Sequence, residues 1–368
     1  MNYLLMNKNK PLLLFECGKN EFEETECTEL EWFDSYRPLG FHNLTDYLAS
    51  RQAPKHRLHI EELLRRYGCD DLEGFLNVTH ALSLNDTLWV KQEASGLKWE
   101  DVSLYRNEFD ELVSMAAFDG RFSSTSLSST SPEFGTDGSY AKCWVREGSD
   151  ITLYKSGSAL FEIEPLSEYL SGQVAELLHL NFVSYDLAYY HNRLISKCRL
   201  FTDETTGLVK AHDVLPEHGR SVSATLKYFT SVGSEDEYRR MCVFDALILN
   251  TDRHTGNFGV LVNNDTMEIK KMAPVYDNNK SLLYDMDINQ LTDKTEWCVG
   301  TCKPKFGTDF ISTAWGMLTE EIRADLLTFK DFEFRPHPEI QTDEKRLEIL
   351  SSIVRNQAAR ILGSKSRF

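Results

Sequence analysis

The chain has 368 residues, of which 41% are apolar and 26% charged, a composition typical of folded globular proteins that excludes extensive disorder. Its 57 acidic and 40 basic residues give a net charge of −17. This charge disfavours binding to nucleic acids or anionic membranes, because the long-range electrostatic term is repulsive. An anionic ligand must therefore be held locally, by basic side chains, backbone N–H groups and metal ions.

The eight cysteines are too few and too scattered for a disulfide framework. Cys298 and Cys302 form the one close pair, which we expect to be two buried thiols; zinc ligation is the weaker alternative, because no second pair or histidines follow at ligand spacing. We find no signal peptide and no apolar stretch long enough to cross a bilayer. These features predict a reducing, cytoplasmic location.

Residues 1–120 mix short strands and helices and predict an α/β accessory or recognition domain without a catalytic constellation. Asn43 can cap a helix through residues 46–51, and residues 56–68 form an amphipathic pattern that Gly68 ends. Residues 99–118 also place apolar side chains at helical spacing.

A Ser/Thr-rich tract, FSSTSLSSTS, dominates residues 121–133 and predicts a flexible linker, with a phosphorylated regulatory segment as the alternative. Residues 134–230 then read as a small sheet-rich lobe. It starts with a glycine-containing hairpin, continues with one helix and ends with two further strands. The helix places one apolar face on Leu166, Leu170, Val174, Leu177 and Leu178.

Residues 231–368 are mainly helical. Ser234 and Glu237 have the spacing of a capping box at the start of a helix that runs to about residue 250. A short hairpin follows, with strands in FGVLV and MEIKK, and the chain closes with a long amphipathic helix in DEKRLEILSSIVRNQAARIL. A sheet-rich part followed by a helical part predicts an α+β fold with two lobes.

The strongest chemical signal is the pattern D-x-x-x-x-N at Asp252 and Asn257, followed by Asp277 at the end of a hairpin. Phosphoryl transfer needs one carboxylate to orient the acceptor hydroxyl and take its proton, and oxygen ligands to hold Mg²⁺ against the phosphates. We assign Asp252 the first role, and Asn257 and Asp277 the second. Asp and Asn are also common turn residues, so the pattern has weight only because of its position between a helix and a hairpin.

The segment LILNTDRHTGNFGVL and the later MAPVYDNNKSLL resemble the catalytic and metal-binding motifs of HipA-like serine/threonine kinases of the HipA/CtkA type. The resemblance follows the order of elements over about residues 130–362 and implies a bilobal protein-kinase-like fold that uses ATP and Mg²⁺. Here Arg253 and His254 follow Asp252, whereas typical eukaryotic kinases place His and Arg before it. This order is similar to that of phosphoinositide kinases. We expect His254 to pack the loop, with orientation of Asp252 as the alternative.

The resemblance also implies where the nucleotide binds. Gly135, Thr136, Gly138 and Ser139 in FGTDGSYAK are candidates for a phosphate-binding loop, whose backbone N–H groups and hydroxyls would meet the phosphates. Lys155 matches the lysine that pairs with the α and β phosphates in the family, and Lys142 is its competitor.

Glu168 is the candidate ion-pair partner of Lys155, because SEYLSGQVAELL resembles the corresponding helix of the family; Glu162, Glu164 and Glu176 are alternatives. The backbone around Phe201 is expected to contact adenine.

These assignments predict an ATP- and Mg²⁺-dependent serine/threonine kinase that phosphorylates itself and a cytoplasmic protein. The alternatives are a lipid or small-molecule kinase, a non-catalytic ATP-binding protein, and nucleotidyl transfer on the same fold. Residues 1–120 do not match the strand-rich domain through which HipA toxins meet a DNA-binding antitoxin. An antitoxin or another regulatory protein therefore stays an open partner, and direct binding to nucleic acid or membrane is not expected.

Overall fold

A computed structural model describes residues 1–55, 58–69, 71–121, 131–158, 163–216 and 221–363. Most of the Ser/Thr-rich tract, at 122–130, and Glu162 lie outside these ranges. The chain divides into two compact units: the first contains residues 1–155, 199–209 and 261–270, and the second contains residues 156–198, 210–260 and 271–368. The domain limits expected from the sequence stay predictions.

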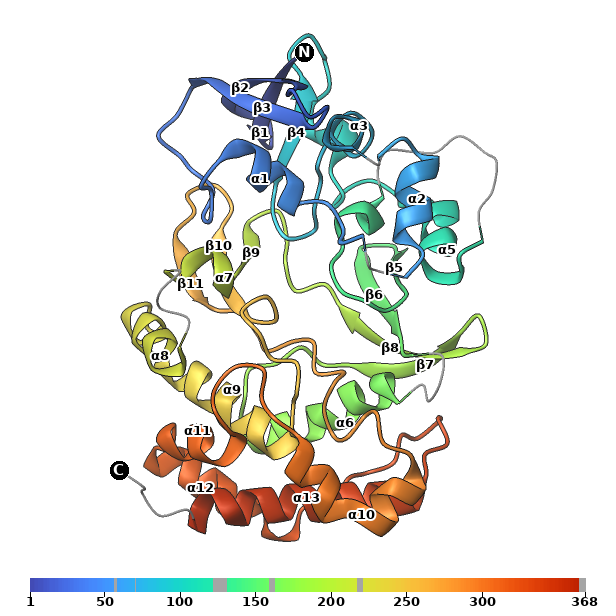
Figure 1. Cartoon of the computed structure of the whole chain (residues 1–368), viewed down its shortest axis with the longest axis vertical. Coiled ribbons are helices and arrows are strands. Elements are labelled where there is room, and N and C mark those ends of the chain that lie inside the picture. Colours follow the sequence, from blue (N-terminus) through green and yellow to red (C-terminus); the bar gives the residue numbers. More distant parts are fainter. Residues whose placement is uncertain (56–57, 70, 122–130, 159–162, 217–220, 364–368) are drawn as a thin grey trace. The chain divides into compact units, whose positions relative to one another are not determined.

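The first unit contains a four-stranded sheet, several short helices and a hairpin (Figure 1). Its elements are β1 (Asn2–Asn7), β2 (Lys10–Lys19), β3 (Thr25–Trp32), α1 (Leu44–Ser50), α2 (Ile60–Arg66), α3 (Leu72–Thr79), β4 (Leu88–Gln92), α4 (Trp99–Val102), α5 (Glu111–Asp119), the 3₁₀ turn η1 (Pro132–Gly135), β5 (Lys142–Glu147), β6 (Asp150–Ser156) and most of β9 (Thr206–Lys210).

The four-stranded antiparallel sheet has the order β3-β2-β1-β4, and apolar side chains pack on both sides of its inner strand β1. Successive side chains of a strand point to opposite faces, so β1 divides its residues between two apolar clusters. Leu5 joins the buried cluster that includes residues of α1, α2 and α3, whereas Met6 joins a second cluster with Trp89 and Trp99. The sequence of β1 therefore specifies a strand that is buried on both faces.

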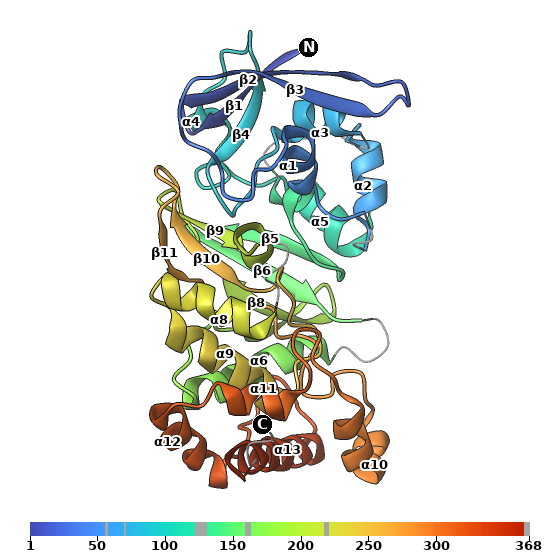
Figure 2. The same cartoon turned by 60° about the vertical axis from the view of Figure 1, so that its left-hand side comes forward.

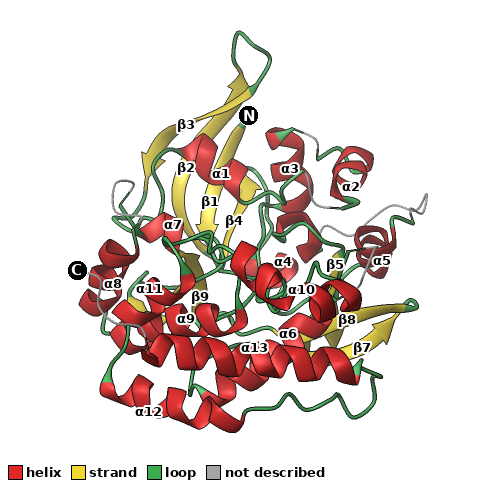
Figure 3. Cartoon of the chain, turned by 60° about the horizontal axis from the view of Figure 1, so that its bottom comes forward, coloured by secondary structure: helices red, strands yellow, loops and turns green. Residues whose placement is uncertain are grey.

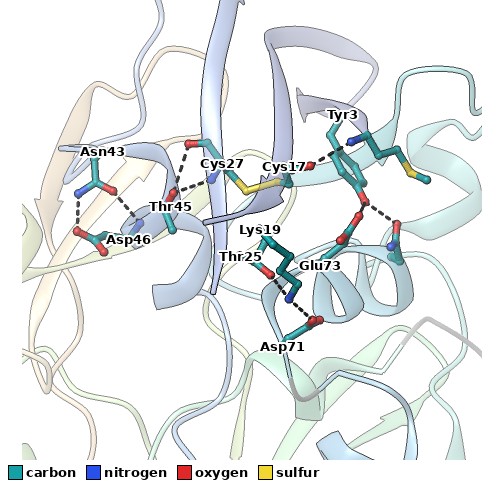
Figure 4. Close-up of a disulfide and its surroundings, with 12 residues drawn as sticks. Tyr3, Cys17, Lys19, Thr25, Cys27, Asn43, Thr45, Asp46, Asp71 and Glu73 are labelled. Atoms are coloured by element: carbon teal, nitrogen blue, oxygen red, sulfur yellow. Dashed lines mark hydrogen bonds and ion pairs between the residues drawn. A yellow bond between two sulfur atoms is a disulfide. The ribbon is translucent and has the colours of Figure 1, made fainter. Parts of the chain in front are cut away.

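One disulfide lies in this sheet and departs from the expectation that the cysteines are unpaired. Cys17 of β2 and Cys27 of β3 face each other in register, with their Cα atoms 4.2 Å apart, and they are bonded (Figure 4). The number and spacing of the cysteines along the chain do not reveal this disulfide, because the register of β2 and β3 decides which two cysteines meet. Cys298 and Cys302 are free thiols, of which Cys298 is buried as expected and Cys302 is only half-buried. The described residues contain no cluster of three or more metal-binding side chains.

The second unit consists mainly of helices. Its elements are α6 (Glu164–Leu177), β7 (Asp186–Tyr190), β8 (Arg193–Arg199), α7 (Ala211–Val214), α8 (Val222–Ser231), α9 (Glu235–Ile248), α10 (Ile288–Thr301), α11 (Phe310–Gly316), α12 (Glu320–Thr328), the 3₁₀ turn η3 (Phe329–Asp331) and α13 (Glu344–Gly363). Strands β10 (Gly259–Asn263) and β11 (Ile269–Met272) run across the border of the two units and form a sheet of order β11-β10-β9.

Helix α9 is the centre of the second unit. It contacts α6, α8, α11 and α13 (Figure 2), and nearly all of its residues from Met241 onward are buried. Helix α13 in turn lies against α10 and α12 (Figure 3). Because the C-terminal half of α9 is mostly apolar and buried on all sides, it can be stable only when other helices cover it.

Several local predictions are confirmed. Asn43 caps α1, Gly68 follows α2 with a positive φ of 65°, and the expected strands β5, β6, β7, β8, β10 and β11 and helices α6 and α13 are present. No helix in the part of the chain that the structure describes is long and apolar enough to span a membrane.

Two local predictions are wrong. Ser234 starts α9 but makes no capping bond, because its hydroxyl accepts a hydrogen bond from the N–H of Met272 at 2.9 Å. A tertiary contact has replaced the local one. The helical pattern over residues 99–118 is interrupted: α4 ends at Val102, and α5 starts after the N-cap Asp110, whose carboxylate accepts from two backbone N–H groups.

Candidate active site

The loop that carries Asp252 and Asn257 follows α9 directly. The helix ends at Leu249, whose backbone has a φ of 52° and turns the chain out of the helix. The buried side chain of Asn250 then donates to the carboxylate of Asp245 at 3.1 Å and accepts from the N–H of Asp252 at 3.0 Å. The position of Asp252 is thus tied to the end of α9.

Arg253 holds this loop together from inside. Its guanidinium, only 3% exposed, pairs with the Asp245 carboxylate at 3.0 Å. The remaining donors reach the carbonyls of Asn257 at 2.9 Å and Tyr276 at 2.7 Å, and the side-chain oxygen of Asn278 at 2.6 Å. Burial alone would lower the pKa of Arg253, but the Asp245 carboxylate outweighs it and raises that pKa. One side chain therefore joins α9, the Asp252 loop and the segment around Asp277.

The carboxylate of Asp252 lies between two lysines. Lys305 Nζ is 2.8 Å from Oδ1, and Lys280 Nζ is 3.0 Å from Oδ2. Partial burial acts to raise the pKa of Asp252, but the hydrogen bonds from Lys305 and Lys280 outweigh it, and the pKa is lowered below its usual range. Asp252 is consequently ionised at neutral pH and can accept a hydrogen bond from a hydroxyl group.

Asn257 and Asp277 are the residues that can hold a metal ion. The Asn257 amide donates to the carbonyl of Asp252 at 3.1 Å, which directs its NH₂ group inward and leaves its carbonyl oxygen as the available ligand. Asp277 adopts a φ of 58°, and its N–H donates to the hydroxyl of Tyr185 at 3.2 Å. One amide oxygen and one carboxylate suit Mg²⁺, which prefers oxygen ligands and retains several waters. The donor set fits this ion.

Glu168 lies in the same unit as this loop, on α6, and is almost fully buried. Its carboxylate accepts a hydrogen bond from the Ser196 hydroxyl at 2.5 Å. Burial, followed by the charge of Glu168 and a smaller effect of Asp277, raises the pKa of Tyr185 well above its usual value. Tyr185 thus stays protonated, and its hydroxyl contacts the segment of Asp277.

His254 packs the loop, which agrees with the first of its two expected roles. Its Nδ1 accepts from the N–H of Gly256 at 3.0 Å. Burial, followed by the charge of Lys305, lowers the pKa of His254. The ring is therefore neutral at physiological pH.

The expected phosphate-binding loop lies in the first unit. Gly138 has a φ of 103°, and a Cβ there would collide with the Lys142 ammonium, which donates to the carbonyl of Asp137 at 2.6 Å. Gly135 packs against backbone instead: a Cβ would lie 2.9 Å from the carbonyl oxygen of Leu82. Two glycines are thus required here, one by its conformation and one by close packing.

The two hydroxyls of this loop differ in their surroundings. The Thr136 hydroxyl donates to the carbonyl of Pro132 at 2.7 Å and accepts from the indole N–H of Trp144 at 2.9 Å. Ser139 is exposed. Only Ser139 can be modified without breaking two existing hydrogen bonds.

Lys155 and Lys142 face each other across the β5–β6 hairpin, and both are buried. Phe201 follows β8 in the stretch of the first unit that begins at Arg199, where Arg199 pairs with Asp150 at 3.0 Å. Asp252, Asn257, Asp277 and Glu168 belong to the second unit, whereas Lys155, Phe201 and the glycine-containing loop belong to the first. The nucleotide-binding roles of these residues stay predictions.

A pocket of about 330 Å³ lies beside the Asp252 loop in the second unit. Its lining residues are Leu249, Thr251, Lys280, Leu283, Tyr284, Asp285, Met286, Thr301, Cys302 and Lys303. Burial raises the pKa of both Tyr284 and Cys302 to about 12, so both are protonated. The pocket includes the residue before Asp252 and one of the lysines that pairs with it, but neither of the two candidate metal ligands.

Sequence reasoning missed the residues that position the site. The position of Arg253 after Asp252 departs from the eukaryotic kinase motif, but an arginine beside the loop aspartate carries several donors in fixed directions and can link loops. The motif DNNKSLL does not by itself give Lys280 a role. Lys305 lies 53 residues after Asp252, and no local pattern in the sequence indicates that the two side chains meet. Tyr185 also had no signal, since its contact with Asp277 spans 92 residues.

No protein-family profile matches the chain, and no curated protein is detectably similar to it in sequence. Among solved structures, it is similar to HipA of the Shewanella oneidensis MR-1 toxin–antitoxin system, solved with HipB and its operator DNA. The TM-score is 0.50 at 11% identity, over 98% of this chain and 97% of that chain. The Helicobacter pylori proinflammatory kinase CtkA matches 60% of this chain and 91% of its own, with a TM-score of 0.45 and 16% identity.

The fold is therefore mixed α/β and similar to that of HipA, which confirms the HipA-type resemblance expected from the sequence.

Replacing Arg253 tests the architecture of the site. We expect Arg253→Met to destabilise the second unit by about 3–5 kcal/mol, because it leaves Asp245 buried without a counter-charge and several acceptors unpaired. Arg253→Lys should not restore stability, since one ammonium cannot reach all of the acceptors. Urea denaturation measures both. A midpoint within error of wild type for Arg253→Met would contradict the central role of this side chain.

Proposed function

We propose that this protein is an ATP- and Mg²⁺-dependent serine/threonine kinase that phosphorylates a cytoplasmic protein and itself. The observation that carries the proposal is the buried Arg253, which ties the loop of Asp252 and Asn257 to the segment of Asp277. Phosphoryl transfer depends on positioning and charge neutralisation, and these three residues supply the required chemistry. The bilobal arrangement typical of kinases is part of this proposal.

In the proposed reaction Asp252 accepts the hydrogen bond of an acceptor hydroxyl and takes its proton as the new P–O bond forms. Because its pKa is lowered, Asp252 is better suited to orient the acceptor hydroxyl than to act as a strong base. Orientation is sufficient when the transition state is largely dissociative. The oxygens of Asn257 and Asp277 would hold Mg²⁺, which neutralises charge on the phosphates when bound. The pocket beside Asp252 would receive the acceptor side chain, because its lining includes neither of those metal ligands.

Three alternatives to a protein kinase stay open. A lipid or small-molecule kinase would use the same residues, and a pocket of about 330 Å³ with mixed polar and apolar lining admits a small acceptor as well as a side chain. Nucleotidyl transfer and non-catalytic ATP binding are separated from kinase activity by one experiment. Incubation with γ-labelled and α-labelled ATP, with and without cell lysate, shows which group is transferred and to what.

The partner of the protein is also part of the proposal. The HipA structure contains HipB and operator DNA. An antitoxin-like or regulatory protein is accordingly a candidate partner of this chain, while its net charge of −17 argues against direct binding to nucleic acid or membranes.

We expect Asp252→Asn to abolish transfer of γ-phosphate while ATP binding is retained, because the variant keeps the shape of the side chain but cannot take a proton. Labelled-ATP transfer and calorimetric ATP titration measure the two properties. Asp265→Asn, at an exposed turn, is the matched control. Near-normal turnover in Asp252→Asn would remove this residue from the mechanism.

Asp277→Ala should instead weaken Mg²⁺-dependent ATP binding by about tenfold or more, because the metal loses its charged ligand. Asn257→Ala should have the same effect to a smaller extent, since the lost ligand is neutral. Calorimetry at several Mg²⁺ concentrations detects both changes. Unchanged affinity and metal dependence in Asp277→Ala would place this carboxylate outside the site.

Autophosphorylation is expected at Ser139 in preference to Thr136, whose hydroxyl is already engaged twice. A phosphate there adds a charge of about −1.5 to −2 where the phosphates of ATP would bind, so it should oppose nucleotide binding. Mass spectrometry of the active protein and of Asp252→Asn tests this. Absence of phosphate between Ser123 and Ser139 in the active protein, or an equal amount in the inactive variant, would exclude self-inhibition at this loop.

A further inference from the structure

The two lysines on Asp252 supply more positive charge than its carboxylate needs. Each ammonium pairs with a different oxygen, at 2.8 Å for Lys305 and 3.0 Å for Lys280. Two ammonium groups thus pair with the single carboxylate of Asp252, at the position where an acceptor hydroxyl would lie. In a chain with a net charge of −17, this local excess needs a reason.

The two lysines are not equivalent. The carbonyl of Lys280 accepts hydrogen bonds from the N–H and the hydroxyl of Thr251, each at 3.1 Å, so its backbone is attached to the residue before Asp252. Its side chain is 25% exposed. Lys305 lies between α10 and α11, is 52% exposed and reaches Asp252 from the surface. Lys280 is therefore the cation whose position the loop determines.

The Asp252 loop offers no other cation for a phosphoryl group. The donors of Arg253 are committed to Asp245, to two backbone carbonyls and to Asn278. The Nδ1 atom of His254 is already engaged, since it accepts a hydrogen bond from the N–H of Gly256. A direct cationic side-chain contact to a transferring phosphoryl group beside Asp252, in addition to bound Mg²⁺, would therefore come from a lysine outside the loop.

We propose that Lys280 is a catalytic residue that bridges Asp252 and the γ-phosphoryl group during transfer. The inference rests on the proposed kinase function. The acceptor oxygen forms a bond to the γ-phosphorus, its proton passes to Asp252, and the bond to the β-phosphate oxygen breaks, so that ADP leaves with the electron pair. Lys280 transfers no proton. Its ammonium meets the charge on the equatorial oxygens of the phosphoryl group, where a fixed cation is most effective.

The competing interpretation is that Lys280 only orients Asp252. Both interpretations predict lower activity when the lysine is removed, so a turnover measurement alone does not separate them. They differ in the affinity for a mimic of the transferring phosphoryl group. A catalytic Lys280 contacts that group, whereas a purely positioning Lys280 does not.

The experiment compares Lys280→Met, Lys280→Arg and Lys305→Met with wild type, and Lys345→Met, an exposed lysine on α13, is the matched control. We expect Lys280→Met to lower kcat about a hundredfold or more with little change in the KM for ATP. It should also weaken binding of Mg²⁺·ADP with aluminium fluoride far more than binding of Mg²⁺·ADP. Lys280→Arg should recover part of both losses, and Lys305→Met should affect the fluoride complex little.

The outcomes separate the two hypotheses. A wild-type protein that neither binds ADP nor transfers phosphate rejects the kinase function and this proposal with it. Transfer in the wild type that persists within about threefold in Lys280→Met rejects only the role of Lys280, as does a kcat loss with unchanged affinity for the fluoride complex. A denaturation midpoint equal to wild type shows that a loss of activity is not unfolding.

Discussion

The buried pair of Arg253 and Asp245 is the interaction on which the candidate site depends. Separately, each charge would be costly to bury, and together they are stable because every direction of the guanidinium meets an acceptor. Arginine is suited to this role, since its planar group holds several donors in fixed directions. The pair places the Asp252 loop and the Asp277 segment on one rigid support, which is the C-terminal end of α9.

The charge at the candidate site comes from residues other than this supporting pair. Arg253 is fully occupied, so it contributes shape and no free charge. The charge that Asp252 experiences comes from Lys280 and Lys305, which lie on other segments and keep its carboxylate ionised. Arg253 thus holds the segments of the site together, whereas Lys280 and Lys305 set the charge around Asp252. A change at Arg253 should act on folding, whereas a change at Lys280 should act on the reaction.

The similarity to HipA shows that the fold is retained at 11% sequence identity. At that distance most surface and core residues have changed, and few local patterns can be matched. The three polar residues that the motif identified, Asp252, Asn257 and Asp277, lie on segments that Arg253 joins. The arrangement of these residues around Arg253 is the physical basis of the proposed function.

The sequence alone determined the features that depend on nearby residues. Helical and strand periodicity located α6, α13 and most strands, Asn43 predicted the cap of α1, and the spacing of Asp252 and Asn257 identified the loop, because each of these signals is local. The tertiary structure decided what depends on distant contacts. It joined Cys17 to Cys27 through strand register, gave the Ser234 hydroxyl to Met272 in place of its own helix, and brought Lys305 to Asp252 across 53 residues. No pattern along the chain encodes such pairs, since their distance in space is set only after α9 and its neighbours have packed.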